Sequence, residues 1–145
     1  MYFGHTWSPV LELEAQPPLL HGHAISVDMC FSAVVAHQLG YLTDGALMQF
    51  LGLFSRLGLS LHHPAFTLDL VKKATKSAIA TRDGHLRAPI PTDNLGTHVI
   101  LQDIDVETLV EAWDSLGSIA RSFPRAGLGL DPAIDIRTLS GTKSP

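Results

Sequence analysis

The segment from about Gly22 to Leu39 is the strongest constraint on how this chain of 145 residues folds, because it is apolar on nearly every helical face. A surface helix shows one apolar stripe, whereas a helix that is apolar all round is buried. We therefore predict a central helix over this segment, with His21 at its start and Gly40 at its end. The other elements then have to surround it.

Three further helices are predicted from apolar spacing and capping residues. One follows Thr43 and ends at Gly58, a second runs from Thr67 to Ala80, and the last follows Asp105. Thr and Asp are favoured N-caps, and glycine is favoured just past a helix end. The spacing of apolar residues in the last helix predicts that five of them face inward: Val106, Leu109, Val110, Trp113 and Leu116.

The remaining segments predict a hairpin and irregular chain. Residues 85–90 and 97–101 flank a turn and are typical of a small antiparallel hairpin. Residues 8–20 contain three prolines and predict an extended loop without a regular helix, and the tail from Pro124 onward is predicted to be irregular. The predicted fold class is therefore mainly α, with one small β-hairpin.

Composition excludes several classes of partner. The formal net charge is −4 and the ten Lys and Arg residues are scattered, so we expect no nucleic-acid binding. No apolar run is long enough to span a bilayer and no signal peptide is recognisable, so we expect no membrane association. Cys30 is the only cysteine, which excludes an intrachain disulfide and favours a buried core residue in a cytoplasmic protein.

Two short motifs near the start place histidines in separate segments. The first is Gly4–Pro9, which contains His5, and the second is Leu19–Ile25, which contains His21. Imidazole is a common zinc ligand, and two histidines from separate segments bind one ion if the fold brings them together. On spacing alone, surface or hydrogen-bonded core histidines are the more frequent alternative.

The residues around these histidines resemble the second half of the sugar phosphate cyclase superfamily, to which 3-dehydroquinate synthase belongs. The dehydroquinate synthase pattern is Gly-His-Thr-Phe-Gly-His, a spacer, and Leu-His-Gly-Glu-Ala, and the first histidine of each motif binds the catalytic metal. These positions match His5 and His21. Pro9 replaces the second histidine of the first motif, and His23 replaces the glutamate.

Both replacements resemble the sedoheptulose 7-phosphate cyclase branch, whose members make 2-epi-5-epi-valiolone or desmethyl-4-deoxygadusol. Residues 54–59 and 82–89 also resemble this branch. The resemblance implies that residues 1–132 form the C-terminal helical domain of the dehydroquinate synthase-like fold. Residues 133–145 are then an irregular tail.

In this superfamily an N-terminal nucleotide-binding domain holds NAD and supplies a glutamate as the third metal ligand. The chain contains no glycine-rich phosphate loop, so we expect that domain to be absent, the NAD site to lie outside the chain, and a separate NAD-binding half to be a partner. The resemblance implies Zn²⁺ or Co²⁺ at His5 and His21. Within the chain, Glu12, Glu14 and His23 are alternative third ligands.

Substrate contacts are also implied by the resemblance. The family places a lysine that contacts the substrate phosphate near the third helix, and the counterparts here are Lys76 and Arg82. His23 either contacts substrate or hydrogen-bonds a backbone carbonyl. No catalytic residue is assignable from the sequence. Expected partners are a sugar phosphate and, in addition, a second copy of the chain as a homodimer.

Three functions follow as alternatives. The first is the metal- and substrate-binding half of a sedoheptulose 7-phosphate cyclase, which performs NAD- and zinc-dependent phosphate elimination and aldol cyclisation and is inactive without its NAD-binding half. The second is a non-catalytic helical remnant that serves as an interaction domain. The third is a 3-dehydroquinate synthase fragment, against which Pro9 and His23 count. We expect the first, as a carbon–oxygen lyase, and the sequence does not identify the cyclitol product.

Overall fold

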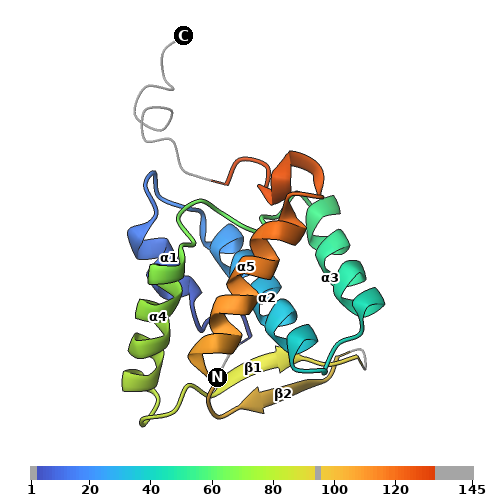
Figure 1. Cartoon of the computed structure of the whole chain (residues 1–145). Helices are drawn as coiled ribbons and strands as arrows, with labels where there is room; N and C mark the ends of the chain where they lie inside the picture. Colours follow the sequence, from blue (N-terminus) through green and yellow to red (C-terminus); the bar gives the residue numbers. More distant parts are fainter. Residues whose placement is uncertain (1–2, 94–95, 133–145) are drawn as a thin grey trace.

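Helices dominate the computed structural model, which describes residues 3–93 and 96–132 (Figure 1). The fold class is mainly α with one small hairpin, as predicted. In chain order the elements are α1 (Ser8–Glu14), α2 (His21–Gln38), α3 (Asp44–Arg56), α4 (Leu68–Thr81), β1 (Ala88–Pro91), β2 (His98–Leu101), α5 (Val106–Ala120) and a 3₁₀ helix η1 (Pro124–Gly127).

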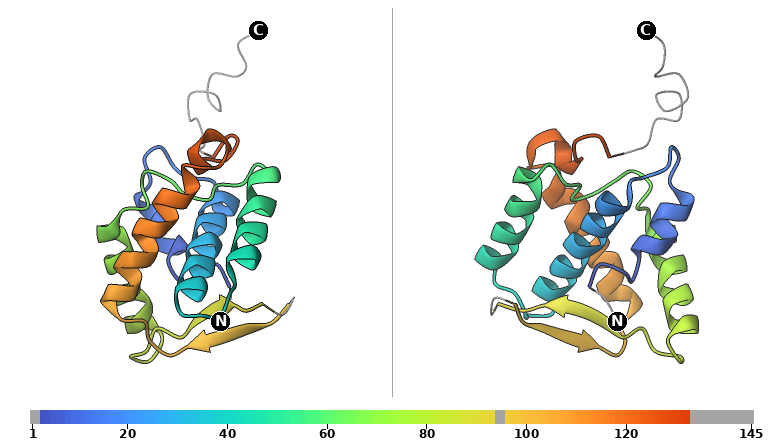
Figure 2. Two further views of the ribbon diagram at one scale, coloured as in Figure 1. Left: turned by 45° about the vertical axis from the view of Figure 1, so that its right-hand side comes forward. Right: turned by 180° about the vertical axis from the view of Figure 1, so that it is seen from behind.

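Helix α2 lies at the centre and contacts α1, α3, α5 and β1. Figures 1 and 2 show α1 and α4 on one side of α2 and α3 on the other, with the hairpin across one end. Its buried residues lie on nearly every side of the helix, which confirms the predicted central helix. They are His23, Ala24, Ser26, Val27, Asp28, Cys30, Phe31, Ser32, Ala33, Val34, Val35 and Ala36.

The predicted N-caps Thr43 and Asp105 are confirmed, and Thr67, predicted as the first residue of its helix, is the N-cap of α4. The side chains of Thr43, Thr67 and Asp105 each accept a hydrogen bond from the backbone amide three residues further on. These bonds satisfy amides that have no partner inside the helix, which fixes where α3, α4 and α5 begin. Val106 was wrongly predicted to face inward, since it is the first residue of α5 and is 58% exposed.

Helix α1 contradicts the prediction that residues 8–20 lack a regular helix. It runs from Ser8 to Glu14 with Pro9 in its first turn. Proline is tolerated there because the first amides of a helix have no intrahelical acceptor, so its missing N–H costs nothing. Pro17 and Pro18 lie beyond the helix end. The prolines therefore bound the helix and do not prevent it.

The hairpin is confirmed, with shorter strands than predicted. Strands β1 and β2 pair antiparallel, from Ala88 opposite Leu101 to Pro91 opposite His98. The chain from Pro124 was predicted to lack regular structure, and η1 at Pro124–Gly127 is not a regular right-handed helix, since Arg125 and Ala126 have φ of 59° and 54°. The predicted tail at 133–145 lies outside the described residues.

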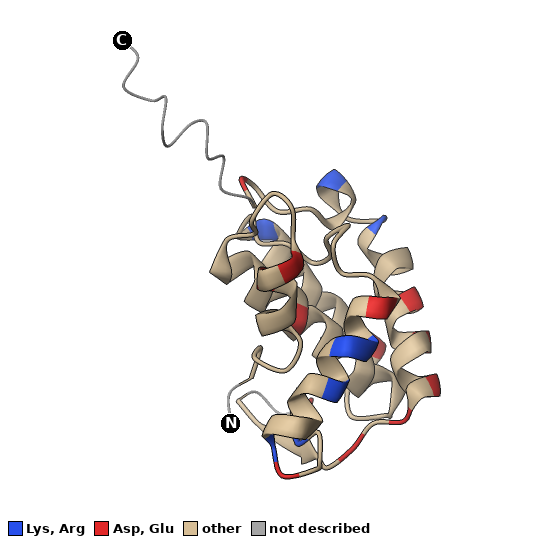
Figure 3. Ribbon diagram, turned by 90° about the vertical axis from the view of Figure 1, so that its left-hand side faces the viewer, with Lys and Arg blue, Asp and Glu red and all other residues tan. Residues whose placement is uncertain are grey.

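The core and the surface agree with the composition. Cys30 is fully buried, as predicted. Within the described part of the chain, no helix combines the length and the apolar character that a bilayer crossing requires. Figure 3 shows acidic and basic residues interspersed along the helices rather than gathered by sign.

Phe31 is the aromatic centre of this core. It is fully buried, and its ring meets those of Trp7 and Phe66 edge to face, at centroid distances of 4.8 Å and 5.2 Å. Such pairs stabilise beyond simple area burial. Phe31 thereby joins α2 to the chain at the start of α1 and to the segment before α4.

We predict that Phe31→Ala lowers the free energy of unfolding by about 3–5 kcal/mol, because it leaves a cavity among these rings. Leu13→Ala is the control, since Leu13 is 81% exposed and its removal should change stability by less than about 0.5 kcal/mol. Urea denaturation followed by circular dichroism measures both. Equal losses in the two variants would contradict the assigned core.

Candidate functional site

His5 lies in a turn that runs against α2 just before α1. Gly4 has φ +85°, and a Cβ at this position would stand 2.7 Å from Cγ2 of Ile25, so glycine is required both for the conformation and for the close approach. The His5 ring is half-buried, and its Nδ1 lies 3.3 Å from the carbonyl oxygen of Phe3.

His21 is the first residue of α2 and is exposed. Its Nδ1 lies 2.9 Å from Oε2 of Glu12 on α1. The His5 and His21 rings approach each other, with centroids 5.9 Å apart and planes at 57°. The structure therefore brings together the two histidines that the sequence singled out.

The arrangement of these rings suits a metal ion. A metal-binding histidine usually bonds an oxygen through one ring nitrogen, which orients the ring and leaves the other nitrogen for the metal. Both rings place Nδ1 next to an oxygen, a carboxylate for His21 and a backbone carbonyl for His5. The role of both residues as zinc ligands stays a prediction.

A third protein ligand is not found beside the pair. The part of the chain that the structure describes contains no group of three His, Cys, Asp or Glu side chains able to hold a metal. Glu12 bonds His21, and Glu14 forms an ion pair with Lys73 on α4. Two histidines with their orienting oxygens are thus what this part of the chain provides.

Asp28 holds the loop that carries His5. Its Oδ2 accepts hydrogen bonds from the backbone amides of Trp7 and Ser8, at 2.5 Å and 2.9 Å. Burial raises the pKa of Asp28 to about 6, although these hydrogen bonds oppose the rise. No role was predicted for Asp28 from the sequence. The signal that could have identified it is that Asp28 is the only Asp, Glu, Lys or Arg in the predicted central helix.

Arg82 also holds this loop, through a backbone carbonyl and a hydroxyl. Its guanidinium donates to the carbonyl oxygens of His5 and Leu86, at 3.1 Å and 2.8 Å, and to the hydroxyl of Thr6 at 3.3 Å. These contacts are with the protein's own chain. Lys76, the other predicted phosphate contact, is exposed on α4. Substrate binding by either residue stays a prediction.

His23 lies apart from the pair and has structural partners. It is 8% exposed, its Nδ1 lies 2.9 Å from the hydroxyl of Ser60, and it accepts a 3.2 Å hydrogen bond from the Ser60 amide. Burial lowers the pKa of His23, and a backbone hydrogen bond to Leu130 opposes that effect. Gly129 packs against the ring so closely that a Cβ would lie 2.4 Å from Cε1. This geometry agrees with the backbone alternative, and a substrate contact stays a prediction.

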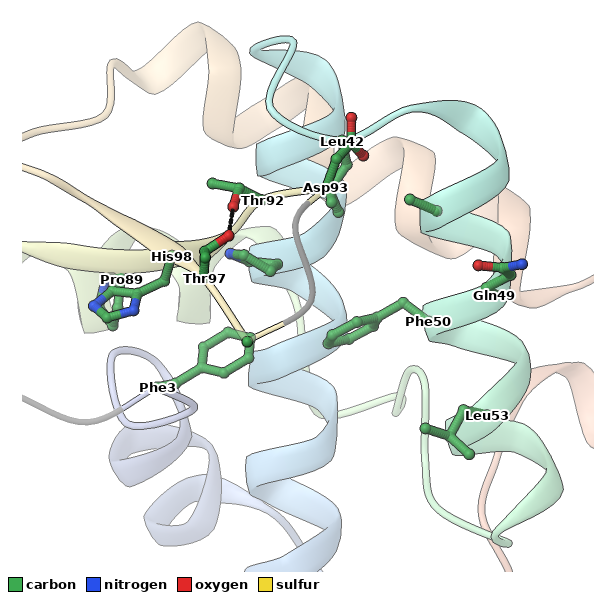
Figure 4. A pocket seen from close by; sticks show the side chains of 13 residues that line it. Phe3, Leu42, Gln49, Phe50, Leu53, Pro89, Thr92, Asp93, Thr97 and His98 are labelled. Atoms are coloured by element: carbon green, nitrogen blue, oxygen red, sulfur yellow. Dashed lines mark hydrogen bonds between the residues drawn. The ribbon is translucent and has the colours of Figure 1, made fainter.

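A cavity of about 490 Å³ opens between α3, the hairpin and the first described residues, and sequence analysis did not predict it. Figure 4 shows Phe3 and Phe50 facing each other, with ring centroids 6.3 Å apart. The hydroxyls of Thr92 and Thr97 hydrogen-bond each other at its rim. Phe3 joins this cavity to the histidine pair, because its carbonyl faces His5.

Comparison with known proteins identifies the family. A family model described as 3-dehydroquinate synthase C-terminal matches residues 1–81, which is more than half of the chain. The chain belongs to the 3-dehydroquinate synthase family. The position of the match agrees with the resemblance of the two histidine motifs, both of which lie within it.

Two similar proteins are a demethyl-4-deoxygadusol synthase and a 2-epi-5-epi-valiolone synthase. Demethyl-4-deoxygadusol synthase of Trichormus variabilis is 45% identical over 129 residues, which cover 89% of this chain and 31% of the relative. The 2-epi-5-epi-valiolone synthase of Streptomyces hygroscopicus subsp. jinggangensis is 39% identical over 102 residues, covering 70% and 24%. These matches support the predicted branch.

The fold is confirmed by a solved structure of the same family. The 2-epi-5-epi-valiolone synthase ValA of S. hygroscopicus, with NAD⁺ and Zn²⁺ bound, matches with a TM-score of 0.77 and 36% identity, over 81% of this chain and 32% of ValA. The chain thus has the fold of a C-terminal dehydroquinate synthase-like domain. It spans about a third of the length of these relatives.

Three buried or half-buried histidines in or near residues 59–63 have lowered pKa values. Burial lowers the pKa of His23, His62 and His63, and His62 is further affected by the positive charges of His63 and Arg121. Nε2 of His62 is buried without a hydrogen-bond partner among the described residues. A buried, unpaired ring nitrogen gains little from accepting a proton.

We predict that these three histidines lower the free energy of unfolding as pH falls below about 6.5. The lowered pKa values mean that the unfolded chain binds protons first, so the contribution is complete above that pH and is lost below it. His62→Gln should decline less than wild type in urea melts between about pH 7.5 and 5.5. Asp28, whose pKa is raised, changes the free energy of unfolding with pH in the opposite direction. It does so equally in wild type and variant, so its effect cancels in the comparison. An equally steep decline in the variant would contradict the prediction.

Proposed function

We propose that this chain is the metal- and substrate-binding part of a sedoheptulose 7-phosphate cyclase. The observation that carries the proposal is the convergence of His5 and His21, which come from separate segments and lie with ring centroids 5.9 Å apart. The similarity to demethyl-4-deoxygadusol and 2-epi-5-epi-valiolone synthases supports the choice of branch. Pro9 and His23 favour it over the dehydroquinate synthase alternative.

In this proposal His5 and His21 hold zinc through one ring nitrogen each. Bound zinc supplies a Lewis acid that polarises hydroxyl and carbonyl oxygens of the sugar phosphate. The chain's own residues orient the ligands, since the Glu12 carboxylate fixes the His21 ring and the Phe3 carbonyl faces the His5 ring. Fixed ring orientations reduce the rearrangement that zinc binding would require.

The chain alone is proposed to be inactive. Two histidines leave half of a tetrahedral zinc shell to other ligands, so affinity is low until a third protein ligand is added. The sequence offers no glycine-rich phosphate loop for NAD. The ValA structure, of which this chain matches 32%, has NAD⁺ and Zn²⁺ bound, which supports a third ligand and an NAD site in the unmatched part.

The cavity lined by Phe3 and Phe50 favours a second candidate, an interaction domain without catalysis. Exposed apolar side chains lie close by in sequence, with Leu53 on α3 at 48% exposure and Leu57, the C-cap of α3, at 64%. An apolar surface of this kind is covered in an assembly. The two candidates differ in metal dependence, since only the first requires it. A homodimer and a cytoplasmic location stay predictions.

Zinc should raise the melting temperature of wild type, because a ligand that binds only the folded state stabilises it. His21→Ala should lose this shift and keep nearly the same melting temperature without metal, since His21 is exposed. The control is His85→Ala, which removes an exposed histidine paired with Asp103 and should retain the full shift. Differential scanning fluorimetry with and without excess zinc measures all three proteins.

An equal zinc shift in wild type and His21→Ala would exclude the histidine pair as the metal site. Absence of any shift in wild type at saturating zinc would exclude metal binding by the isolated chain.

Phosphate release tests the activity. We expect no phosphate from sedoheptulose 7-phosphate when the purified chain is given zinc and NAD, and release once the unmatched part of ValA is added. His5→Ala should abolish that release. The comparison substrate is 3-deoxy-arabino-heptulosonate 7-phosphate, which dehydroquinate synthases use.

Turnover of the comparison substrate would assign the chain to the dehydroquinate synthase branch. Continued absence of turnover with the added part, together with no zinc shift, would favour the interaction domain.

A further inference from the structure

Asp28 is a fully buried carboxylate on a helix whose other buried residues are mostly apolar. A buried charge is unfavourable unless hydrogen bonds compensate for it. The compensating bonds come from Trp7 and Ser8, two consecutive amides at the start of α1, and both reach the same oxygen, Oδ2. The position of Asp28 in the core is thus tied to the position of this loop.

Asp28 and His21 belong to the same helix. They are seven residues apart, which is close to two turns, so they lie on one side of α2. Helix α2 therefore presents His21 at its first residue and holds the loop containing His5 two turns later. The distance between the two histidines is set by one rigid element.

Arg82 completes this attachment. Its two terminal nitrogens donate to the carbonyl oxygens of His5 and Leu86 and to the Thr6 hydroxyl. The carboxylate thus binds the amides of the loop, and the guanidinium binds its carbonyl side. A further bond from the Ser8 hydroxyl to the Gly4 carbonyl, at 2.7 Å, closes the turn.

We propose that Asp28 is the positioning residue of the histidine pair, fixing the His5 loop to the helix that carries His21, with Arg82 also holding the loop. The expected effect on zinc affinity rests on the proposed function. The expected effect on the position of the His5 loop does not. It assigns to Arg82 a positioning role in addition to the predicted phosphate contact.

The test separates loop geometry from metal binding. The ring ¹H–¹⁵N signals of His5 and His21 are recorded without metal for wild type, Asp28→Ala and Asp28→Asn, and zinc affinity is then titrated for each. We expect Asp28→Ala to move the His5 signals, to leave those of His21 in place, and to weaken zinc binding at least tenfold. Asp28→Asn keeps one oxygen acceptor and should retain the His5 signals and zinc affinity within about threefold of wild type.

Leu109→Ala is the control for lost stability alone. Leu109 is buried on α5, and its truncation should destabilise the protein without moving the His5 signals. If Asp28→Ala does not fold, Arg82→Ala is measured instead, since it removes the bond to the His5 carbonyl. That variant should move the His5 signals in the same way.

Unchanged His5 signals in the folded Asp28→Ala variant, or in Arg82→Ala where it replaces it, would overturn the inference. An equal movement in Leu109→Ala would overturn it as well. A wild type that binds no zinc but whose His5 signals move in Asp28→Ala would refute the proposed function and support the positioning role.

Discussion

The burial of α2 on nearly every side is the constraint on which the rest of the structure depends. A helix with so little exposed surface cannot rest on a neighbour at one side only, so α1, α3, α5 and β1 contact it. The only charged side chain within it, Asp28, is then forced into the interior and must be hydrogen-bonded there. Its partners are the amides that begin α1. The packing of the core and the shape of the histidine loop therefore have a common origin.

Elements with strong local signals were predictable from the sequence. The caps at Thr43, Thr67 and Asp105 mark helix starts through side chains that bond nearby amides, so no distant residue is involved. Helix α1 is not predictable from proline content alone, because the effect of proline depends on its position: Pro9 lies in the first turn, and Pro17 and Pro18 lie beyond the helix end. Val106 shows a related limit, since spacing gives a face but not how far a neighbouring element covers the first turn.

The candidate site was predictable in part. His5 and His21 were identified from motifs that lie close together in the sequence, and the fold then brings them together. The hydrogen bonds by which Asp28 and Arg82 hold the His5 loop were not predictable in that way. The partners of Asp28 lie 20 and 21 residues away and those of Arg82 up to 77 residues away, and no local pattern specifies such pairs. The cavity near Phe50 likewise depends on how α3 and the hairpin are placed.

Phe3 belongs to two surroundings at once. Its ring lines the cavity opposite Phe50, while its carbonyl oxygen faces Nδ1 of His5 two residues later. Gly4 lies between Phe3 and His5, and its backbone packs so closely against α2 that a Cβ there would stand 2.7 Å from Cγ2 of Ile25. The cavity lining and the carbonyl beside the His5 ring therefore come from one residue, so a change in the backbone at Phe3 would alter both.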